Sequence, residues 1–360
     1  MRNDPTHSWQ GIVWTFLVLG IPVAVAALLL ASTGPVLARV VTDTLIKLTM
    51  VVGLYIFIGN SGIFSFGHAA FIVVGSYASA WMTIPPTFKK VILPGLPAFM
   101  QSIHLDPFTG GLVGVLLAAV LAFVIGLALM RLAGIAASIA SFAFFSVIVV
   151  IYNNWTGWTK GTASLVGLPV YAGPKLALAA ALVAMLLALL FQHSRYGLLL
   201  RATREDAAAA RAAGVEVERM RLIAFVVSAA VVAAGGVLQG HFNGALTTTA
   251  NVHLNLTFLI LAMLVVGGMR SLAGAVIGVA ILAFVAELLR QLERGWQIGD
   301  FTITAPSGLG QVGLGIVMLV VLISRPQGLT KGREIPMPGW LSRRERQGDA
   351  NLIESTQNAR

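Results

Sequence analysis

The sequence lacks cysteine entirely, and charged residues make up only 11% of its 360 positions. Without cysteine there can be no disulfide, no thiolate metal site and no thiol nucleophile. A soluble domain usually carries about 25% charged residues. The low charge, together with 57% hydrophobic residues and a mean hydropathy of +0.87, excludes an ordinary soluble protein and indicates a polytopic membrane protein.

Catalytic motifs are absent as well. The sequence has no H-E-x-x-H and no G-x-S-x-G, and its six histidines show no ligand spacing, so no metal, cofactor or enzymatic activity is predicted. Ionisable residues are scarce within the apolar stretches. Glu287 lies near the end of one, and Asp43 and Lys47 form an i,i+4 pair near the outer surface. Proton- and ion-driven transporters usually keep buried carboxylates, so this scarcity argues against such a mechanism.

What the sequence has in abundance is long apolar windows. About 20 apolar residues cross a hydrocarbon core roughly 30 Å thick as a helix. We therefore predict an all-α transmembrane bundle of about ten spans, of which 69–84, 255–269 and 308–324 are short enough to be re-entrant or tilted. Glycine and alanine concentrate at 110–142 and 229–240, where small residues favour close helix packing. The windows are 11–31, 40–59, 69–84, 110–130, 132–152, 174–192, 221–240, 255–269, 271–290 and 308–324.

The distribution of positive charge predicts the orientation. An even number of spans puts both termini on one side of the membrane. Arginines concentrate in the loop 193–220 and after residue 325, whereas the predicted outer loops 85–109, 153–173 and 241–254 carry fewer positive charges. Because cytoplasmic loops are enriched in Lys and Arg, both termini are predicted to be cytoplasmic. The same loops account for the formal charge of +10, so no nucleic-acid partner is expected.

The stretch GNSGIFSFGHAAF, residues 59–71, interrupts the apolar sequence with glycines and polar side chains. It fits the spacing G-x-x-x-x-G, but His68 and Ala69 stand where a phosphate loop needs Lys and Ser or Thr, so no nucleotide site is predicted. Irregular backbone at membrane depth survives where it is buried in protein or lines a wet cavity, and discontinuous helices often line transport pathways. A plain cytoplasmic turn is the alternative. The candidate pathway residues are Asn60, Gly62, Ser65, Gly67 and His68.

The longest basic segment, residues 193–221, contains the signature of a short helix. Thr203 is a plausible N-cap with Asp206 three residues later as a capping box, alanines follow, and Gly214 is a good stop. The helix is too short and too charged to span the bilayer. It suits docking into a groove on another protein, the alternative being a solvated or headgroup-bound surface helix.

The predicted outer loop 151–169 combines polar and aromatic residues. Its tryptophans fit the interfacial aromatic belt of membrane proteins. Asn153 and Asn154, at the end of a span, either face a substrate or cap a helix. Both are kept as candidate pathway residues.

Four stretches, taken in order, resemble one family. They are GLYIFIGNSGIFSFGHAAFIVVGSY at 53–77, YNNWTGWTKGTASLVGLP at 152–169, the segment 196–240, and 265–290 with ISRPQGL at 323–329. Together they resemble the permease subunits of high-affinity branched-chain amino-acid ABC importers, of the LivM-like type. The resemblance covers roughly residues 40 to 330. One departure is Tyr55, where the family often has Asn after Gly-Leu.

The resemblance implies an inner-membrane permease that pairs with a second homologous permease subunit. Two cytoplasmic ATPase subunits would power the complex, and a periplasmic substrate-binding protein would deliver the substrate. It places a permease domain at 1–330, with a coupling segment at 193–220, and leaves 331–360 as a basic, disordered cytoplasmic tail. Relatives for urea, short amides and other small solutes, and a stand-alone secondary transporter, remain alternatives. The residues expected to couple to the ATPase are Thr203, Arg204, Glu205, Asp206, Arg211 and Gly214.

Overall fold

The apolar windows of the sequence all form helices. The computed structural model describes residues 9–247, 250–298, 301–303, 306, 308–325, 327–332 and 334–335. Within these residues, seven helices are long and apolar enough to cross a membrane by length and composition. An all-α membrane bundle is therefore confirmed. The seven helices are α1 (Trp9–Ser32), α2 (Pro35–Ser61), α6 (Pro107–Leu129), α7 (Gly134–Asn154), α9 (Pro174–His193), α12 (Val217–Asn243) and α14 (Leu272–Arg294).

The three windows that the sequence marks as short are shorter helices in the structure as well. They comprise 16 residues in α3, 18 in α13 and 16 in α15. Their length does not by itself make them complete spans. The bounds are α3 (His68–Thr83), α13 (Ala250–Gly267) and α15 (Leu309–Ser324).

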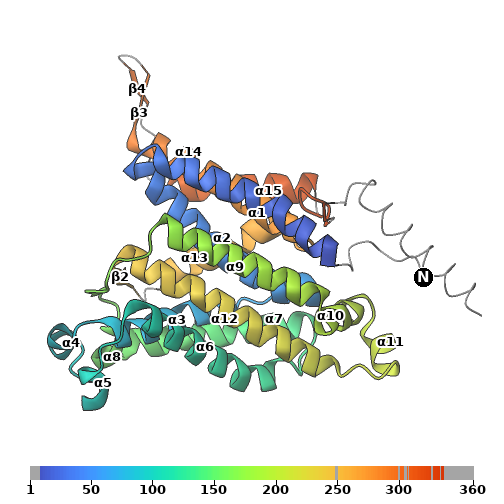
Figure 1. Ribbon diagram of the computed structural model, residues 1–360, viewed down its shortest axis with the longest axis horizontal. Helices are drawn as coiled ribbons and strands as arrows, with labels where there is room; N and C mark the ends of the chain where they lie inside the picture. Colours follow the sequence, from blue (N-terminus) through green and yellow to red (C-terminus); the bar gives the residue numbers. More distant parts are fainter. Residues whose placement is uncertain are drawn as a thin grey trace, which may run out of the picture.

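The connections gather at the two ends of the bundle (Figure 1). One end carries α4 (Pro86–Ile92), α5 (Ala98–Ser102) and α8 (Thr156–Thr159), and we call it the α4–α5 end. The opposite end carries α10 (Arg195–Glu205) and α11 (Ala207–Ala212), and we call it the α10–α11 end.

Two antiparallel pairs of short strands also lie towards the α4–α5 end (Figure 1). In the first pair Leu165 lies opposite Leu246, and in the second Gln297 lies opposite Thr302. The strands are β1 (Leu165–Val166), β2 (Ala245–Leu246), β3 (Trp296–Ile298) and β4 (Phe301–Ile303).

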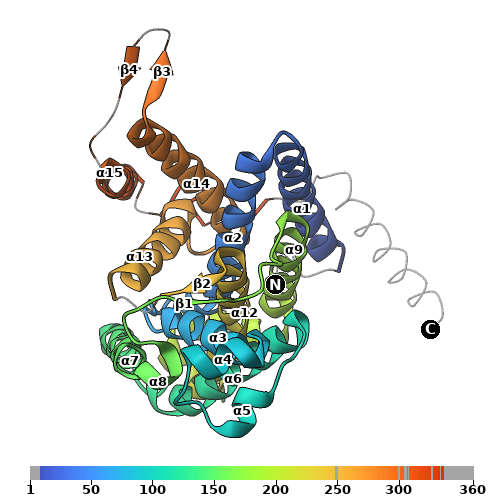
Figure 2. The same cartoon turned by 90° about the vertical axis from the view of Figure 1, so that its left-hand side faces the viewer.

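The helix α2 lies at the centre of the bundle. Of its apolar window 83% is buried, against 28% for each of α1, α6 and α7. The helix is buried because neighbours surround it: α2 packs against α12, α9 and α14. In Figure 2, α13, α14 and α15 lie on one side of α2 and α12, with α3, α6 and α7 below.

Glycines allow the central helices to approach closely. A Cβ atom on Gly114 of α6 would lie 2.4 Å from the carbonyl oxygen of Gly75 in α3. One on Gly236 of α12 would lie 2.6 Å from the carbonyl oxygen of Ile72, also in α3. In lipid there is little hydrophobic driving force between helices, so they associate largely through close van der Waals packing. Small residues at a helix crossing allow this packing because they let the two backbones approach. The close packing predicted for 110–142 and 229–240 is confirmed at these positions.

We expect Gly114→Ala to lower the free energy of unfolding by about 2 kcal/mol, because the added methyl group meets backbone that cannot move aside. Gly315→Ala is the matched control, since no atom lies within 4 Å of a Cβ added there. That control should leave stability unchanged or raise it by up to about 1 kcal/mol through helix propensity. Thermal unfolding of the purified variants in detergent checks this, and equal melting temperatures would contradict it.

Candidate functional site

The glycine-rich stretch is a true interruption between two helices. The helix α2 ends at Ser61, and Gly62 takes the left-handed conformation with φ of 72° while its N–H bonds to the carbonyl of Ile58. Helix α3 begins at His68. Residues 62–67, which we call the break, connect the two helices without continuing either, with Ile63, Ser65 and Gly67 buried and Gly62 and Phe64 exposed.

Ser65 of the break and His68, the first residue of α3, are buried in packed protein. His68 is 0% exposed, and its Nδ1 lies 2.9 Å from the Ser65 hydroxyl. Its ring packs against Phe57, Phe71 and Phe225, with centroid distances of 5.4, 6.1 and 5.0 Å. The break thus satisfies the membrane constraint by burial in protein in this conformation, and not by lining an open cavity.

The side chains of α7 brace the break from one side. The Ser138 hydroxyl donates to the carbonyl of Phe64 at 2.7 Å, and the N–H of Phe66 donates to the Ser141 hydroxyl at 3.2 Å. A Cβ atom on Gly67 would lie 3.0 Å from the carbonyl oxygen of Ser141. Gly67 is thus required for close approach to α7. Asn60 is also buried and donates to the carbonyl of Ile56 at 2.9 Å.

The predicted coupling helix is two helices, and the predicted N-cap is wrong. Thr203 lies in the last turn of α10, where its hydroxyl donates to the carbonyl of Leu200 at 2.7 Å. The helix α10 starts earlier because the Ser194 hydroxyl accepts from the N–H of Gly197. Asp206 instead caps α11, with its carboxylate accepting from the N–H groups of Ala208 and Ala209 at 2.8 and 3.0 Å. The predicted stop is confirmed, since Gly214 has φ of 84° just past α11.

Arg204 joins the two candidate regions that the sequence identifies separately. Its Nη1 donates to the carbonyl of Gly59 at 2.6 Å, and its side chain is only 16% exposed. A Cβ atom on Gly62 would lie 2.8 Å from Cγ of Arg204, so only glycine admits the arginine stem. The last helical turn before the break is therefore held by α10.

Two arginine–glutamate ion pairs lie on this surface, Arg204–Glu205 and Arg211–Glu218, and their arginines differ in exposure. Glu205 is exposed and pairs with Arg204 at 2.8 Å, which holds the pKa of its carboxyl below the usual range. It stays ionised at neutral pH, and the pair is lost only as the pH falls through that lowered pKa. Arg211 of α11 pairs with Glu218 at 2.7 Å, and both are about half exposed. Arg204 thus faces the protein and Arg211 faces outward.

A carboxylate that sequence reasoning missed lies beside this region. Glu334 accepts hydrogen bonds from the N–H groups of Leu272 and Ala273, at 2.7 and 3.3 Å, at the start of α14. The hydroxyl of Tyr55 lies 3.3 Å from the same carboxylate and 2.9 Å from the side-chain oxygen of Gln192. An acidic residue at a helix N-terminus is a favourable arrangement, but residue 334 falls in the segment predicted as a disordered tail. Residues 336–360 of that segment lie outside the described residues.

Asn153 and Asn154 lie at the other end of the bundle. The side chain of Asn154 donates to the carbonyl of Val150 at 2.8 Å, which is the helix-end role weighed from the sequence. The side-chain oxygen of Asn153 is buried and has no hydrogen-bond partner among the described residues. Because α7 starts beside the break and runs 21 residues, about 30 Å, to these asparagines, the structure does not bring them to the break.

The loop 85–109 at this end is anchored by a buried lysine. The ammonium of Lys89 donates to the carbonyl oxygens of Trp81, Met100 and Ile103, the last two at 3.1 and 2.7 Å. Burial lowers the pKa of Lys89. Its hydrogen bonds thus connect α4 to the end of α3, to α5 and to the residue that follows α5.

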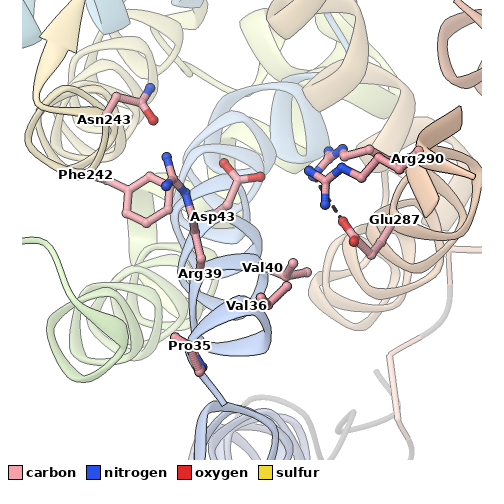
Figure 3. A pocket seen from close by; sticks show the side chains of 10 residues that line it. Pro35, Val36, Arg39, Val40, Asp43, Phe242, Asn243, Glu287 and Arg290 are labelled. Carbon is pink, nitrogen blue, oxygen red and sulfur yellow. Dashed lines mark hydrogen bonds and ion pairs between the residues drawn. The ribbon is translucent and has the colours of Figure 1, made fainter. Parts of the chain in front are cut away.

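Two hollows open beside α2 towards the α4–α5 end. The first, of about 570 Å³, lies between α2, α12 and α14 and is lined by charged residues that include Arg39, Asp43, Glu287 and Arg290. Figure 3 shows Asp43 between Arg39 and the Glu287–Arg290 ion pair. The second hollow, of about 560 Å³, shares Asp43 with the first and adds Lys47 and a largely apolar lining.

Comparison with known proteins places this architecture in a family. The family model described as "Branched-chain amino acid transport system / permease component" matches residues 36–322. The chain is 28% identical over 143 residues to the probable branched-chain amino acid transport permease protein LivH of Methanocaldococcus jannaschii, covering 39% of this chain and 42% of that protein. It is 30% identical over 128 residues to the high-affinity permease protein LivM of Escherichia coli K12, covering 36% and 27%. The match thus spans less than half the length of these relatives, and no solved structure matches.

Removing the cap of α11 should loosen that helix alone. We expect Asp206→Ala to speed amide hydrogen exchange at 208–213 about fivefold, corresponding to the roughly 1 kcal/mol that an N-cap contributes. Asp206→Asn keeps an acceptor and should exchange nearly as wild type. Thr203→Val should leave 208–213 unaffected, since the Thr203 hydroxyl bonds within α10. Faster exchange at 208–213 in the Thr203 variant would restore the original N-cap assignment.

Proposed function

Because the chain belongs to the family of permease components of branched-chain amino acid transport systems, we propose that it is the membrane-spanning permease subunit of an ATP-driven importer. Its substrates are branched-chain or related hydrophobic amino acids. It pairs with a second homologous permease, two cytoplasmic ATPase subunits and a periplasmic binding protein. It hydrolyses no ATP itself, and it lies in the inner membrane with both termini in the cytoplasm.

The contact of Arg204 with Gly59 is the observation that carries the coupling mechanism. A force applied to α10 and α11 by a docked ATPase passes through the Arg204 guanidinium to the end of α2 and the adjoining break. The outward-facing side chains of α11, among them Arg211, are available to a partner. Since an effector shifts an equilibrium only through its differential affinity for the two states, the ATPase contact with this surface must differ between them.

The break is the element proposed to open. In the described conformation Asn60, Ser65 and His68 are buried against α7 and the surrounding phenylalanines. We assign this conformation to a closed cytoplasmic side. Movement of α10 would draw the end of α2 away from α7 and expose Ser65, Gly67 and His68 to the pathway, beside Gly62, which is already exposed. Asn153 and Asn154 would then meet the substrate earlier, at the α4–α5 end.

We propose the following domain assignment. The permease domain comprises 1–330 with the coupling segment 193–220. Glu334 extends it slightly, because its carboxylate bridges the start of α14 and Tyr55. Tyr55 replaces the family's usual asparagine, and a Cβ atom on Gly59 would lie 2.5 Å from its ring. Tyr55, Gly59 and Arg204 thus form one packed group at the end of α2.

We expect Arg204→Met to uncouple ATP hydrolysis from transport. The methionine keeps an apolar stem beside Gly62 but cannot donate to the Gly59 carbonyl, so substrate uptake should fall about tenfold while the ATPase rate stays within about twofold. Glu205→Gln is the matched control, because it removes the ion pair and leaves the Arg204–Gly59 hydrogen bond in place. Uptake and ATPase rates are measured on the reconstituted complex. Unchanged coupling in the Arg204 variant would refute this route.

The partners and the energy source are tested together by affinity capture from mild-detergent membranes and by uptake into proteoliposomes. We expect a second permease and two ATPase subunits to co-purify, and leucine uptake to require both ATP and the loaded binding protein. A chain that purifies alone and transports without ATP would instead be a secondary transporter. ATP-dependent uptake of urea or a short amide, but not of leucine, would keep the importer and change its substrate.

A further inference from the structure

The second hollow carries an ion pair at a depth where charge is costly. Lys47 lies 12 residues into α2, about 18 Å along the helix from Pro35. Its ammonium donates to the carboxylate of Asp43, and the two side chains are 14% and 23% exposed. Ionisable residues within spans are rare and usually mark a functional site. The pair therefore needs a reason beyond local helix stability, to which an i,i+4 pair adds only about 0.5 kcal/mol.

Unused hydrogen-bonding capacity surrounds the pair. The side chain of Gln239 on α12 donates weakly to Asp43 at 3.5 Å, while its own oxygen is buried without a hydrogen-bond partner. A buried polar atom left unpaired costs free energy that a ligand can recover. Asn243 and Asn255 add further amides to the lining of the same hollow.

Apart from Gln311 of α15, the remaining side chains of the lining are apolar. They come from α13, α14 and α15, and the volume of the hollow, about 560 Å³, falls in the range typical of small-molecule sites. The apolar residues are Leu256, Phe258, Leu259, Ala262, Leu282, Leu314 and Met318.

We propose that this hollow is a binding site for a zwitterionic α-amino acid with an apolar side chain, in which Asp43 receives the α-ammonium group and Lys47 the α-carboxylate. The inference rests on the proposed function and deepens it by locating the substrate on this chain. Among the described residues that line the hollow, Asp43 and Lys47 are the charged ones, so its net charge is zero. A neutral site with one charge of each sign matches a zwitterion better than it matches a carboxylic acid, an amine or an uncharged amide.

Exchanging partners is energetically accessible. Breaking a mostly buried ion pair is costly unless each charge gains a new partner, and the ligand supplies a carboxylate for Lys47 and an ammonium group for Asp43. Each charge then keeps an opposite charge, and the Gln239 oxygen gains a donor from the ammonium group. The aliphatic side chain of the ligand meets the leucines and Met318 across the hollow.

The first hollow forms an approach to the second. On α2, Arg39 precedes Asp43 by one turn, and Asp43 precedes Lys47 by another, so the ion pair lies deeper than the arginine. Asp43 borders both hollows. A substrate entering from the α4–α5 end passes the charged first hollow before it reaches the apolar second one.

The test exploits the absence of cysteine from the chain. A Met318→Cys variant is assembled in the complete complex, and maleimide labelling of this chain is followed by mass spectrometry. L-Leucine at ten times its dissociation constant should slow labelling about tenfold. 4-Methylpentanoate, which lacks the ammonium group, and 3-methylbutylamine, which lacks the carboxylate, should not. Val36→Cys, which lines only the first hollow, is the control and should label equally with or without leucine.

Three further variants separate binding from folding. Asp43→Asn with Lys47→Met should abolish protection of Met318→Cys by leucine, and Glu287→Gln with Arg290→Met, which removes the ion pair of the first hollow, should preserve it. Leu259→Trp keeps the ion pair but fills the apolar side. It should abolish protection by leucine and retain protection by glycine, which a merely misfolded complex would not do.

The outcomes separate this site from the importer itself. ATP-dependent leucine uptake by a complex in which leucine never protects Met318→Cys would overturn the site and leave the proposed function standing. Protection without ATP-dependent uptake would support the site and overturn the importer. Equal protection by leucine, 4-methylpentanoate and 3-methylbutylamine would also overturn the site. The hollow would then bind apolar groups without recognising the ammonium and carboxylate groups of the amino acid.

Discussion

The structure depends on satisfying the backbone of a broken helix inside a membrane. Where α2 stops, carbonyl and N–H groups lose their helical partners, and lipid offers none. Here Arg204 of α10 donates to the carbonyl of Gly59, and Ser138 and Ser141 of α7 bond the carbonyl of Phe64 and the N–H of Phe66. The break is thus stabilised by side chains from two elements, so it cannot open unless α7 or α10 moves.

That dependence explains why the polar residues of the break are buried. A segment proposed to open has to be closed in one state. When such a segment is irregular backbone, other elements have to supply its hydrogen bonds in the closed state. The phenylalanines around His68 exclude water, and Arg204 secures the end of α2 from the surface side. A displacement of α10 would remove the hydrogen bond at Gly59 first. This makes the arginine a natural point of control for the neighbouring residues.

Local signals in the sequence predicted local structure well. The apolar windows gave helices, the glycines gave the break, and Gly214 gave a helix end, because each depends on a few adjacent residues. Thr203 was misassigned because Ser194 starts a helix early enough to pass through it, leaving Asp206 to cap the next one. The contact between Arg204 and Gly59 joins residues 145 positions apart, and no periodicity or spacing within either segment encodes it. Glu334 was hidden for the same reason, since its partners Leu272, Ala273 and Tyr55 lie 62, 61 and 279 residues earlier.

The helix α2 connects the two regions that we propose to act in transport. Asp43 and Lys47 lie on its half nearer the α4–α5 end, and Gly59 lies in its last turn, about 24 Å further along the axis. Between them Tyr55 bonds Gln192 of α9 and lies against Glu334, which also holds the start of α14. A buried helix with tight neighbours transmits displacement along its length more readily than it bends. Under the proposed mechanism, a movement that α10 imposes at Gly59 would therefore reach the ion pair, and separation of that pair by a ligand would act back on the break through the same helix.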